Sequence, residues 1–231
     1  MNIGMQDAFN LGWKLARVVT GALPESVLDT YETERRPIGV QNIEDTERLY
    51  GAILRPHTFG DASLRLLIPH LLGIGPVSHR VAERFAQMDF HYAPNPLVAS
   101  DQGGSGIPAG KRAPDAYASR VATGETVRLF DLYRSGRWQA FAWALQPDDL
   151  PALEQALTGN PPLLDSYVVD ATRTGLSAKT EIPLLRDMLG RAADAFEVNR
   201  ATIHIVRPDG VVAYRGSARH GLPESITKLL S

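Results

Sequence analysis

Few residues of this 231-residue chain are grouped in a way that could do chemistry. The stretch GGSGIPAGKR (103–112) comes nearest to a phosphate-binding loop, but Ser105 stands where a glycine is required and Arg112 where Ser or Thr would bind magnesium. The same stretch fails as a nucleophile elbow around Ser105, because Ile107 replaces the closing glycine and no strand is expected before it. We therefore expect a flexible linker here.

The titratable residues are equally dispersed. The six histidines show no metal-binding spacing, so no metal site is predicted. His204 lies in an alternating apolar run and is expected to point outward from a strand. The absence of cysteine excludes disulfides, thiolate nucleophiles and CxxC redox chemistry. In ETERR (32–36), Glu32 and Arg36 form an i,i+4 pair on a solvated helix face, and a packed ion-pair joint between helices is the alternative.

The composition limits the classes of molecule that this chain is expected to bind. A net charge of −2 and a pI of about 6.3 give no electrostatic basis for binding nucleic acid or an anionic membrane. No apolar run approaches the roughly 18 residues of a membrane span, and the first residues lack the pattern of a signal peptide. We expect a cytoplasmic protein with one or two domains.

The elements that would position any site begin with helices. Small residues recur every four positions from Gly4 to Ala16, and such a bare helix face lets another backbone or a flat group approach closely. A second helix is expected from near Ser26, and Pro37 is expected to kink or divide it. The expected elements of the first part are helices over 4–20, 26–54, 61–75 and 76–88, and a short strand over 89–92.

The pattern changes after a stretch rich in Gly, Pro, Ala and Ser. Strands and helices then alternate, which predicts an α/β domain with a mixed sheet. Two alternating runs joined at Asp209 and Gly210 predict a hairpin over Val206–Tyr214. The expected elements are strands over 126–133, 137–145 and 163–171, helices over 148–159 and 182–198, the hairpin within 201–216, and a closing helix over 222–231.

Two phrases near the start carry a family resemblance. MNIGMQDAFNLGWKLA (1–16) and LDTYETERRPIGVQ (28–41) resemble the class A FAD-dependent aromatic hydroxylases, in the branch of phenol hydroxylase and the polyketide-tailoring hydroxylases. Later phrases resemble the thioredoxin-like C-terminal domain of that branch: AGKRAPDA, LFDLYRSGRWQAFAW and VRPDGVVAYRG.

The resemblance implies an α/β architecture in three segments. Residues 1–92 would be the incomplete helical tail of the FAD- and substrate-binding domains, 93–109 a linker, and 110–231 the thioredoxin-like domain with a mixed sheet. The implied reaction is hydroxylation of an aromatic or polyketide substrate with FAD, NAD(P)H and O₂. The backbone amides of Met1 and Asn2 would face the flavin, and no side chain is assigned a catalytic role.

Other features of the family are missing from this sequence. The dinucleotide fingerprint GxGxxG, the Gly-Asp phrase and the glycines before Met-Asn are not found. The sequence therefore resembles the C-terminal portion of a hydroxylase, and we expect it alone to retain no FAD and to lack activity. An expressed fragment, a proteolytic product, a misplaced start codon and a real short gene all stay open.

Loss of the flavin sheet would uncover apolar side chains of the first two helices. These are expected to be Leu11, Leu15, Val18, Tyr31 and Ile38. Either the first fifty residues rearrange or become disordered, or a homodimer buries these side chains. The alternative function is a standalone, redox-inactive thioredoxin-like module for binding or dimerisation.

Overall fold

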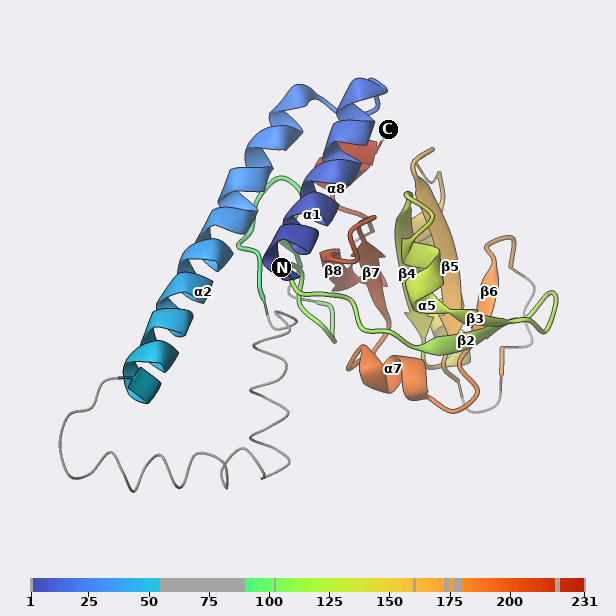
Figure 1. Cartoon of the computed structure of the whole chain (residues 1–231). Coiled ribbons are helices and arrows are strands. Elements are labelled where there is room, and N and C mark those ends of the chain that lie inside the picture. Colours follow the sequence, from blue (N-terminus) through green and yellow to red (C-terminus); the bar gives the residue numbers. More distant parts are fainter. Residues whose placement is uncertain are drawn as a thin grey trace.

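The computed structural model describes residues 2–54, 90–101, 103–159, 161–172, 175–176, 180–218 and 221–230. Two long helices, α1 (Asn2–Val19) and α2 (Asp29–Leu54), stand beside an α/β domain built on a mixed sheet (Figure 1). The short helix η1 (Glu25–Leu28) joins them. The predictions of a first helix and of an α/β domain with a mixed sheet are confirmed.

Helix α2 runs without interruption through Pro37, so the predicted division there is wrong. Pro37 is exposed, and its ring therefore meets solvent rather than a packed neighbour. The buried side chains Glu34 and Arg35 precede it, and the half-buried Ile38 follows. These contacts hold both sides of the proline in place, which compensates for the helical hydrogen bond that proline cannot donate.

The sheet has eight strands in the order β1-β8-β7-β4-β5-β6-β2-β3. The central strand β4 pairs parallel with β5 and antiparallel with β7, and β7 pairs antiparallel with β8. This βαβ unit followed by a hairpin and a helix is the arrangement expected of the thioredoxin-like segment. The strands are β1 (Ala99–Ser100), β2 (Tyr117–Arg120), β3 (Thr126–Arg128), β4 (Trp138–Ala144), β5 (Leu164–Asp170), β6 (Leu184–Arg186), β7 (Thr202–Val206) and β8 (Val212–Ser217).

Helices cover both faces of the sheet. All seven residues of β4 are buried, as expected for a strand packed on both sides. Trp138 belongs to one apolar cluster, with α6 and α8, while Phe141 and Trp143 belong to the other, with Phe196. The helices of this domain are α5 (Leu129–Tyr133), η2 (Pro147–Asp149), α6 (Leu150–Leu157), α7 (Arg191–Ala195) and α8 (Glu224–Leu230).

The hairpin prediction is confirmed in detail. Strands β7 and β8 are antiparallel neighbours, and the Arg207 N–H donates to the Val211 carbonyl across the turn at 2.8 Å. Gly210 has φ of 78°, which only glycine adopts readily, and its N–H donates to the Arg207 carbonyl at 2.9 Å. The turn therefore has the residue type that its backbone requires.

Two element predictions are wrong in part. Residues 129–133 form α5 rather than a strand, because Leu129, Leu132 and Tyr133 are buried at helical spacing. Within 182–198 only Arg191–Ala195 is helical, since residues 184–186 complete the sheet between β5 and β2.

Residues 90–92 are irregular rather than a strand. The helices expected over 61–75 and 76–88 lie outside the described residues.

His204 is fully buried, so the prediction that it points outward is wrong. The alternating pattern was misleading because both faces of β7 are covered: all five of its residues are buried. The ring packs against Trp143 and Phe196, with centroid distances of 6.3 and 5.3 Å. Burial lowers the pKa of His204 from 6.5 to about 3, so the ring is neutral at physiological pH.

The segment 103–112 is packed rather than flexible. Ser105 is buried, and its hydroxyl oxygen accepts the N–H groups of Asn199 and Arg200 at 3.2 and 3.3 Å. A Cβ at Gly106 would lie 2.4 Å from the Phe196 carbonyl oxygen. The glycine and serine pattern here serves close packing against the end of α7 and the start of β7.

Candidate functional site

The predicted cofactor-binding position lies at the N-terminal end of α1. Asn2 is the first residue of this helix, and Met1 lies outside the described residues. The first N–H groups of any helix have no partner within it and carry partial positive charge. The first turn of α1 holds no acidic residue to neutralise that charge. This end of the helix can therefore stabilise negative charge on a neighbouring group.

One face of α1 is exposed to solvent although it is apolar. We call this the outward face of α1. Phe9 is 70% exposed and Met5 51%, and no described atom lies within 4 Å of a Cβ built on Gly4 or Gly12. The outward face consists of Gly4, Met5, Ala8, Phe9, Gly12, Leu15, Ala16 and Val19, all uncharged and exposed.

The observed exposure of these side chains partly contradicts the prediction of which residues would be uncovered. Of the five side chains that were expected to be uncovered, one, that of Leu15, is exposed. The other four are half-buried against the α/β domain or the neighbouring helix: Leu11, Val18, Tyr31 and Ile38. Residues 2–54 are helical over most of their length, which is not the disordered outcome.

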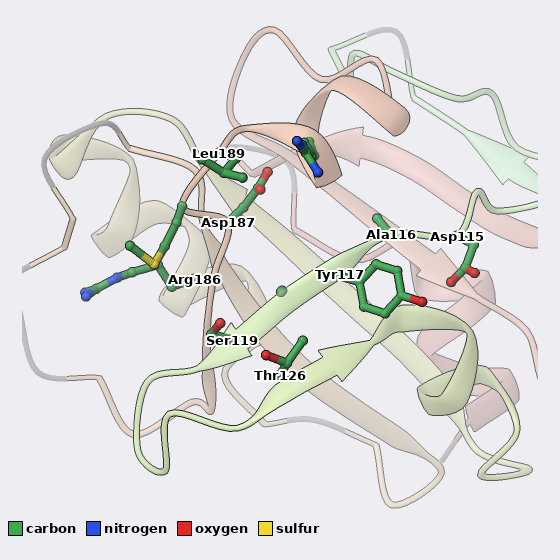
Figure 2. A pocket seen from close by; sticks show the side chains of 11 residues that line it. Asp115, Ala116, Tyr117, Ser119, Thr126, Arg186, Asp187 and Leu189 are labelled. Carbon is green, nitrogen blue, oxygen red and sulfur yellow. The ribbon is translucent and has the colours of Figure 1, made fainter.

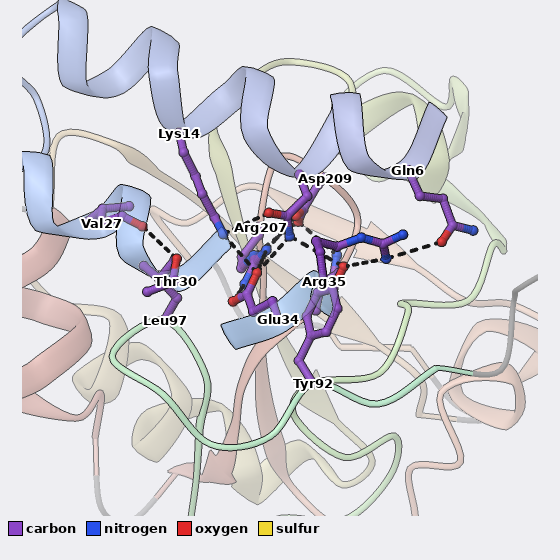
Figure 3. A network of polar contacts seen from close by, with 12 residues as sticks. Gln6, Lys14, Val27, Thr30, Glu34, Arg35, Tyr92, Leu97, Arg207 and Asp209 are labelled. Carbon is purple, nitrogen blue, oxygen red and sulfur yellow. Dashed lines mark hydrogen bonds and ion pairs between the residues drawn. The ribbon is translucent and has the colours of Figure 1, made fainter. Parts of the chain in front are cut away.

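The opposite face of α1 is polar and buried. Asn10 and Lys14 are 1% and 0% exposed, and both donate to Glu34 of α2. Figure 3 shows Lys14 beside Glu34, which also pairs with Arg207 of the β7–β8 turn. We call this group the polar joint. Its members are Asp7, Asn10, Lys14, Glu34, Arg35, Tyr92, Arg207 and Asp209.

Glu34 is the centre of the polar joint. Its carboxylate accepts two hydrogen bonds from the Arg207 guanidinium, at 2.6 and 3.0 Å. Lys14 Nζ donates to it at 2.9 Å, and Asn10 Nδ2 at 2.7 Å. Asn95 Nδ2 adds a further contact at 3.2 Å. One carboxylate thus ties together both helices, the segment after residue 90 and the hairpin turn.

Arg35 forms the second half of the polar joint. Its Nε donates to Asp7 of α1 at 2.6 Å, and its Nη1 donates to the Tyr92 hydroxyl at 3.2 Å. Asp209 accepts from Arg207 and thereby offsets the second buried guanidinium. Each buried charge has an opposite charge within contact distance, as buried ions require.

The electrostatics follow from this pairing. Burial alone would raise the pKa of Glu34, but the charge and hydrogen bonds of Arg207, with Lys14, lower it to about 2. Burial and the charge of Arg207 lower the pKa of Lys14 to about 8, against the opposing effect of Glu34. The polar joint is thus a fixed ionised network near neutral pH, and its geometry suits positioning rather than proton transfer.

Sequence reasoning found part of the polar joint. The exposed pair of Glu32 and Arg36 is confirmed at 2.8 Å, while Glu34 and Arg35 realise the alternative of a packed ion-pair joint. Asn10 and Lys14 were missed, although two polar residues at i,i+4 spacing share one face of the helix and are a signal that could have found them.

A cavity with charged walls lies away from these helices. It has a volume of about 520 Å³, between the β2–β3 ribbon and the loop after β6 (Figure 2). Its carboxylates and Arg186 are already engaged: Asp115 pairs with Arg128 at 2.6 Å, and Arg186 with Asp170 at 3.3 Å. Asp187 accepts the Ala193 N–H at 2.8 Å. The cavity therefore offers no carboxylate for acid–base work.

Neither a metal-binding cluster nor a membrane-spanning helix occurs among the described residues. Among them, no group of three or more His, Asp or Glu side chains is arranged to hold a metal ion. None of the helices within the described ranges is long and apolar enough to cross a membrane.

Comparison with known proteins shows similarity to flavin-dependent enzymes. Residues 1–46 match the FAD binding domain family. The chain is 32% identical over 206 residues to pentachlorophenol 4-monooxygenase of Sphingobium chlorophenolicum, covering 89% of this chain and 33% of that protein. It is 29% identical to 6-methylpretetramide 4-monooxygenase of Streptomyces rimosus, covering 94% and 38%.

A solved structure agrees with these matches. The structure of CabE, an aromatic hydroxylase from angucycline biosynthesis, superimposes with a TM-score of 0.62 at 26% identity, over 93% of this chain and 37% of that one. The chain therefore spans between a third and two fifths of the length of these relatives.

Proposed function

We propose that this chain, a relative of the FAD-dependent aromatic and polyketide monooxygenases, is part of an enzyme that hydroxylates an aromatic or polyketide substrate. The reaction would use FAD, NAD(P)H and O₂ in the cytoplasm, a reducing compartment that suits a chain without cysteine. The flavin, when bound, would supply the oxygen and redox chemistry, and the chain would position it.

The observation that carries this proposal is a coincidence between two independent features. The residues that match the FAD binding domain family, 1–46, are α1, η1 and most of α2. The same helices bear the apolar outward face and the positive helix end. A contiguous apolar surface on a folded protein is typical of an interaction site. The FAD-binding part of the enzyme is the proposed occupant of that face.

The roles of the residues follow from their places. The N–H groups of the first turn of α1, beginning at Asn2, would face the negatively charged edge of the flavin. Gly4 and Gly12 would let the flavin-binding part approach the α1 backbone closely. The polar joint would fix the rotation of α1 about its axis, so that the outward face and the helix end stay aimed at the cofactor.

When no flavin-binding part is present, a second copy of this chain would cover the outward face. This homodimer follows from the same physical argument, because each Å² of apolar surface that stays in contact with water forgoes about 25 cal/mol of stabilisation. Phe9 and Val19, at 70% and 84% exposure, would be the anchors of either interface.

A co-expression experiment tests the proposed function. This chain is expressed with the portion of pentachlorophenol 4-monooxygenase that lies before the matched region, and the purified pair is examined for flavin absorbance and NAD(P)H oxidation. The pair is expected to retain flavin, and this chain alone is expected to retain none. The relative's own matched region serves as the positive control for complementation.

A pair of variants makes the test specific to the outward face. Gly12→Arg places a long charged side chain where no described atom lies within 4 Å, so the fold should tolerate it while association is lost. Val121→Arg, at a 42% exposed position after β2, is the matched control and should associate normally. Equal association of both variants, or flavin bound by this chain alone, would refute the proposed arrangement.

A further inference from the structure

A cavity of about 400 Å³ opens between α1, α5 and the β7–β8 turn. We call it the aromatic cavity. Its volume lies in the range of small-molecule sites, and its walls are mainly aromatic, as such sites require. The aromatic and thioether side chains of its walls come from Met5, Phe9, Phe90, Tyr92, Phe130 and Tyr133.

The rings of the aromatic cavity are fixed by neighbours rather than free to collapse inward. Phe90 packs on Tyr92 with a centroid distance of 4.9 Å, and Phe130 on Tyr133 with 5.8 Å. The Tyr133 hydroxyl donates to the Pro114 carbonyl at 3.1 Å, and the Tyr92 hydroxyl accepts from Arg35. The polar tips are thus engaged, so the wall that these rings present to the cavity is mainly apolar.

The charge at the cavity is positive. Arg112 lines it with its guanidinium carbon 5.2 Å from the Phe130 ring centroid, and within the described ranges no carboxylate forms an ion pair with it. Arg134 also lines the cavity, and its ion pair with Asp131 is long, at 3.8 Å. The acidic wall residue, Asp209, is committed to Arg207. An arginine that stacks on a ring and has no carboxylate partner can donate two parallel hydrogen bonds to one anion.

We propose that the aromatic cavity is a binding site for a planar aromatic anion, with its ring between Phe130 and Phe90 and its carboxylate or phenolate on Arg112. The site lies within this chain's own described residues. It goes beyond the proposed function, because it needs neither flavin nor a second chain and can fail while that function stands. The cavity in Figure 2 is not an equivalent candidate, since its carboxylates and Arg186 already have partners.

Two probes that share a ring system test the charge requirement. Binding of 2-naphthoate and of the uncharged 2-naphthylmethanol is measured by calorimetry and by ligand-observed NMR, up to several millimolar. Naphthoate is expected to bind at least about tenfold more tightly, the usual value of one charge-assisted hydrogen bond. Equal affinity for both probes, or no binding of naphthoate, overturns the proposal.

Three variants locate the site. Arg112→Gln is expected to abolish the preference for naphthoate, while Phe130→Leu, which keeps an apolar side chain, weakens both probes several-fold. Arg200→Gln removes an exposed arginine far from the cavity walls and is the matched control, with no expected change. Circular dichroism checks that each variant is folded. If Arg112→Gln does not fold, Phe130→Leu decides: unchanged affinity for both probes in that variant overturns the proposal.

Discussion

Replacing Glu34 with glutamine should detach the two long helices from the α/β domain. The substitution keeps the shape of the side chain but removes the charge that compensates Arg207 and Lys14, both 0% exposed. The pKa of Glu34 is lowered from 4.5 to about 2, and each pKa unit corresponds to about 1.4 kcal/mol, so its ionised form gains about 3 kcal/mol from its partners. That value matches the usual cost of about 3–5 kcal/mol for breaking a buried ion pair.

Urea denaturation and thermal unfolding measure this loss. For a chain of this size, about 3 kcal/mol corresponds to a fall in Tm of roughly 6–12 °C. Amide hydrogen exchange shows which elements lose stability. Protection in α1 should fall before protection in β4, because the polar joint holds α1 to the domain. Glu32→Gln is the matched control on the same helix, since Glu32 and its partner Arg36 are about 70% exposed and such pairs contribute about 0–1 kcal/mol.

The pH dependence has a definite sign. The folded-state pKa of Glu34 is depressed, so its contribution is fully present above about pH 4.5 and is lost as the pH falls toward 2. In the Glu34→Gln variant that part of the acid sensitivity should vanish. If Glu34→Gln unfolds at the same urea concentration as Glu32→Gln, the polar joint does not hold the helices, and the reasoning fails.

Three further predictions concern the α/β domain. The pKa of His204 is lowered to about 3 in the folded state, so acidification below pH 6.5 protonates the unfolded state preferentially and lowers the free energy of unfolding. At pH 5 the loss is about 2 kcal/mol. His204→Phe should remove this pH dependence in urea titrations. Gly106→Ala should destabilise severely, because its φ of 94° and a 2.4 Å approach to a carbonyl oxygen exclude a Cβ, whereas Gly124→Ala, with nothing described within 4 Å, should lower the free energy of unfolding by only about 1 kcal/mol. Ser105→Ala should cost about 1 kcal/mol by removing the acceptor of two part-buried N–H groups, as calorimetry can measure.

The elements that the sequence predicts well are those whose pattern is local. The hairpin at Asp209 and Gly210 has both alternation and a turn residue with positive φ, and it forms where expected. Strand β4 is apolar at every position except Gln139, which suffices to recognise a buried strand. Residues 129–133 were harder because five residues are too few to separate a helical period from alternation.

The burial of His204 and the ion pair between Glu34 and Arg207 were not predictable from local pattern. His204 lies in an alternating run, but burial on both faces of β7 depends on helices and loops from elsewhere in the chain. Glu34 and Arg207 are 173 residues apart, so no spacing rule joins them. The pairing becomes visible only when the fold brings α2 against the β7–β8 turn.

The polar joint also explains why α1 can leave an apolar face in solvent. A helix held to a domain by apolar contacts alone would turn its most apolar side inward, because burial of that side is the main driving force. In α1 the inward side carries Asp7, Asn10 and Lys14, and rotation of the helix would leave Glu34 without two of its donors and the buried Arg35 without its carboxylate. An unpaired buried charge costs more than the burial of one or two apolar side chains returns. The ion pairs therefore select one orientation of α1, and that orientation keeps the outward face available to a partner.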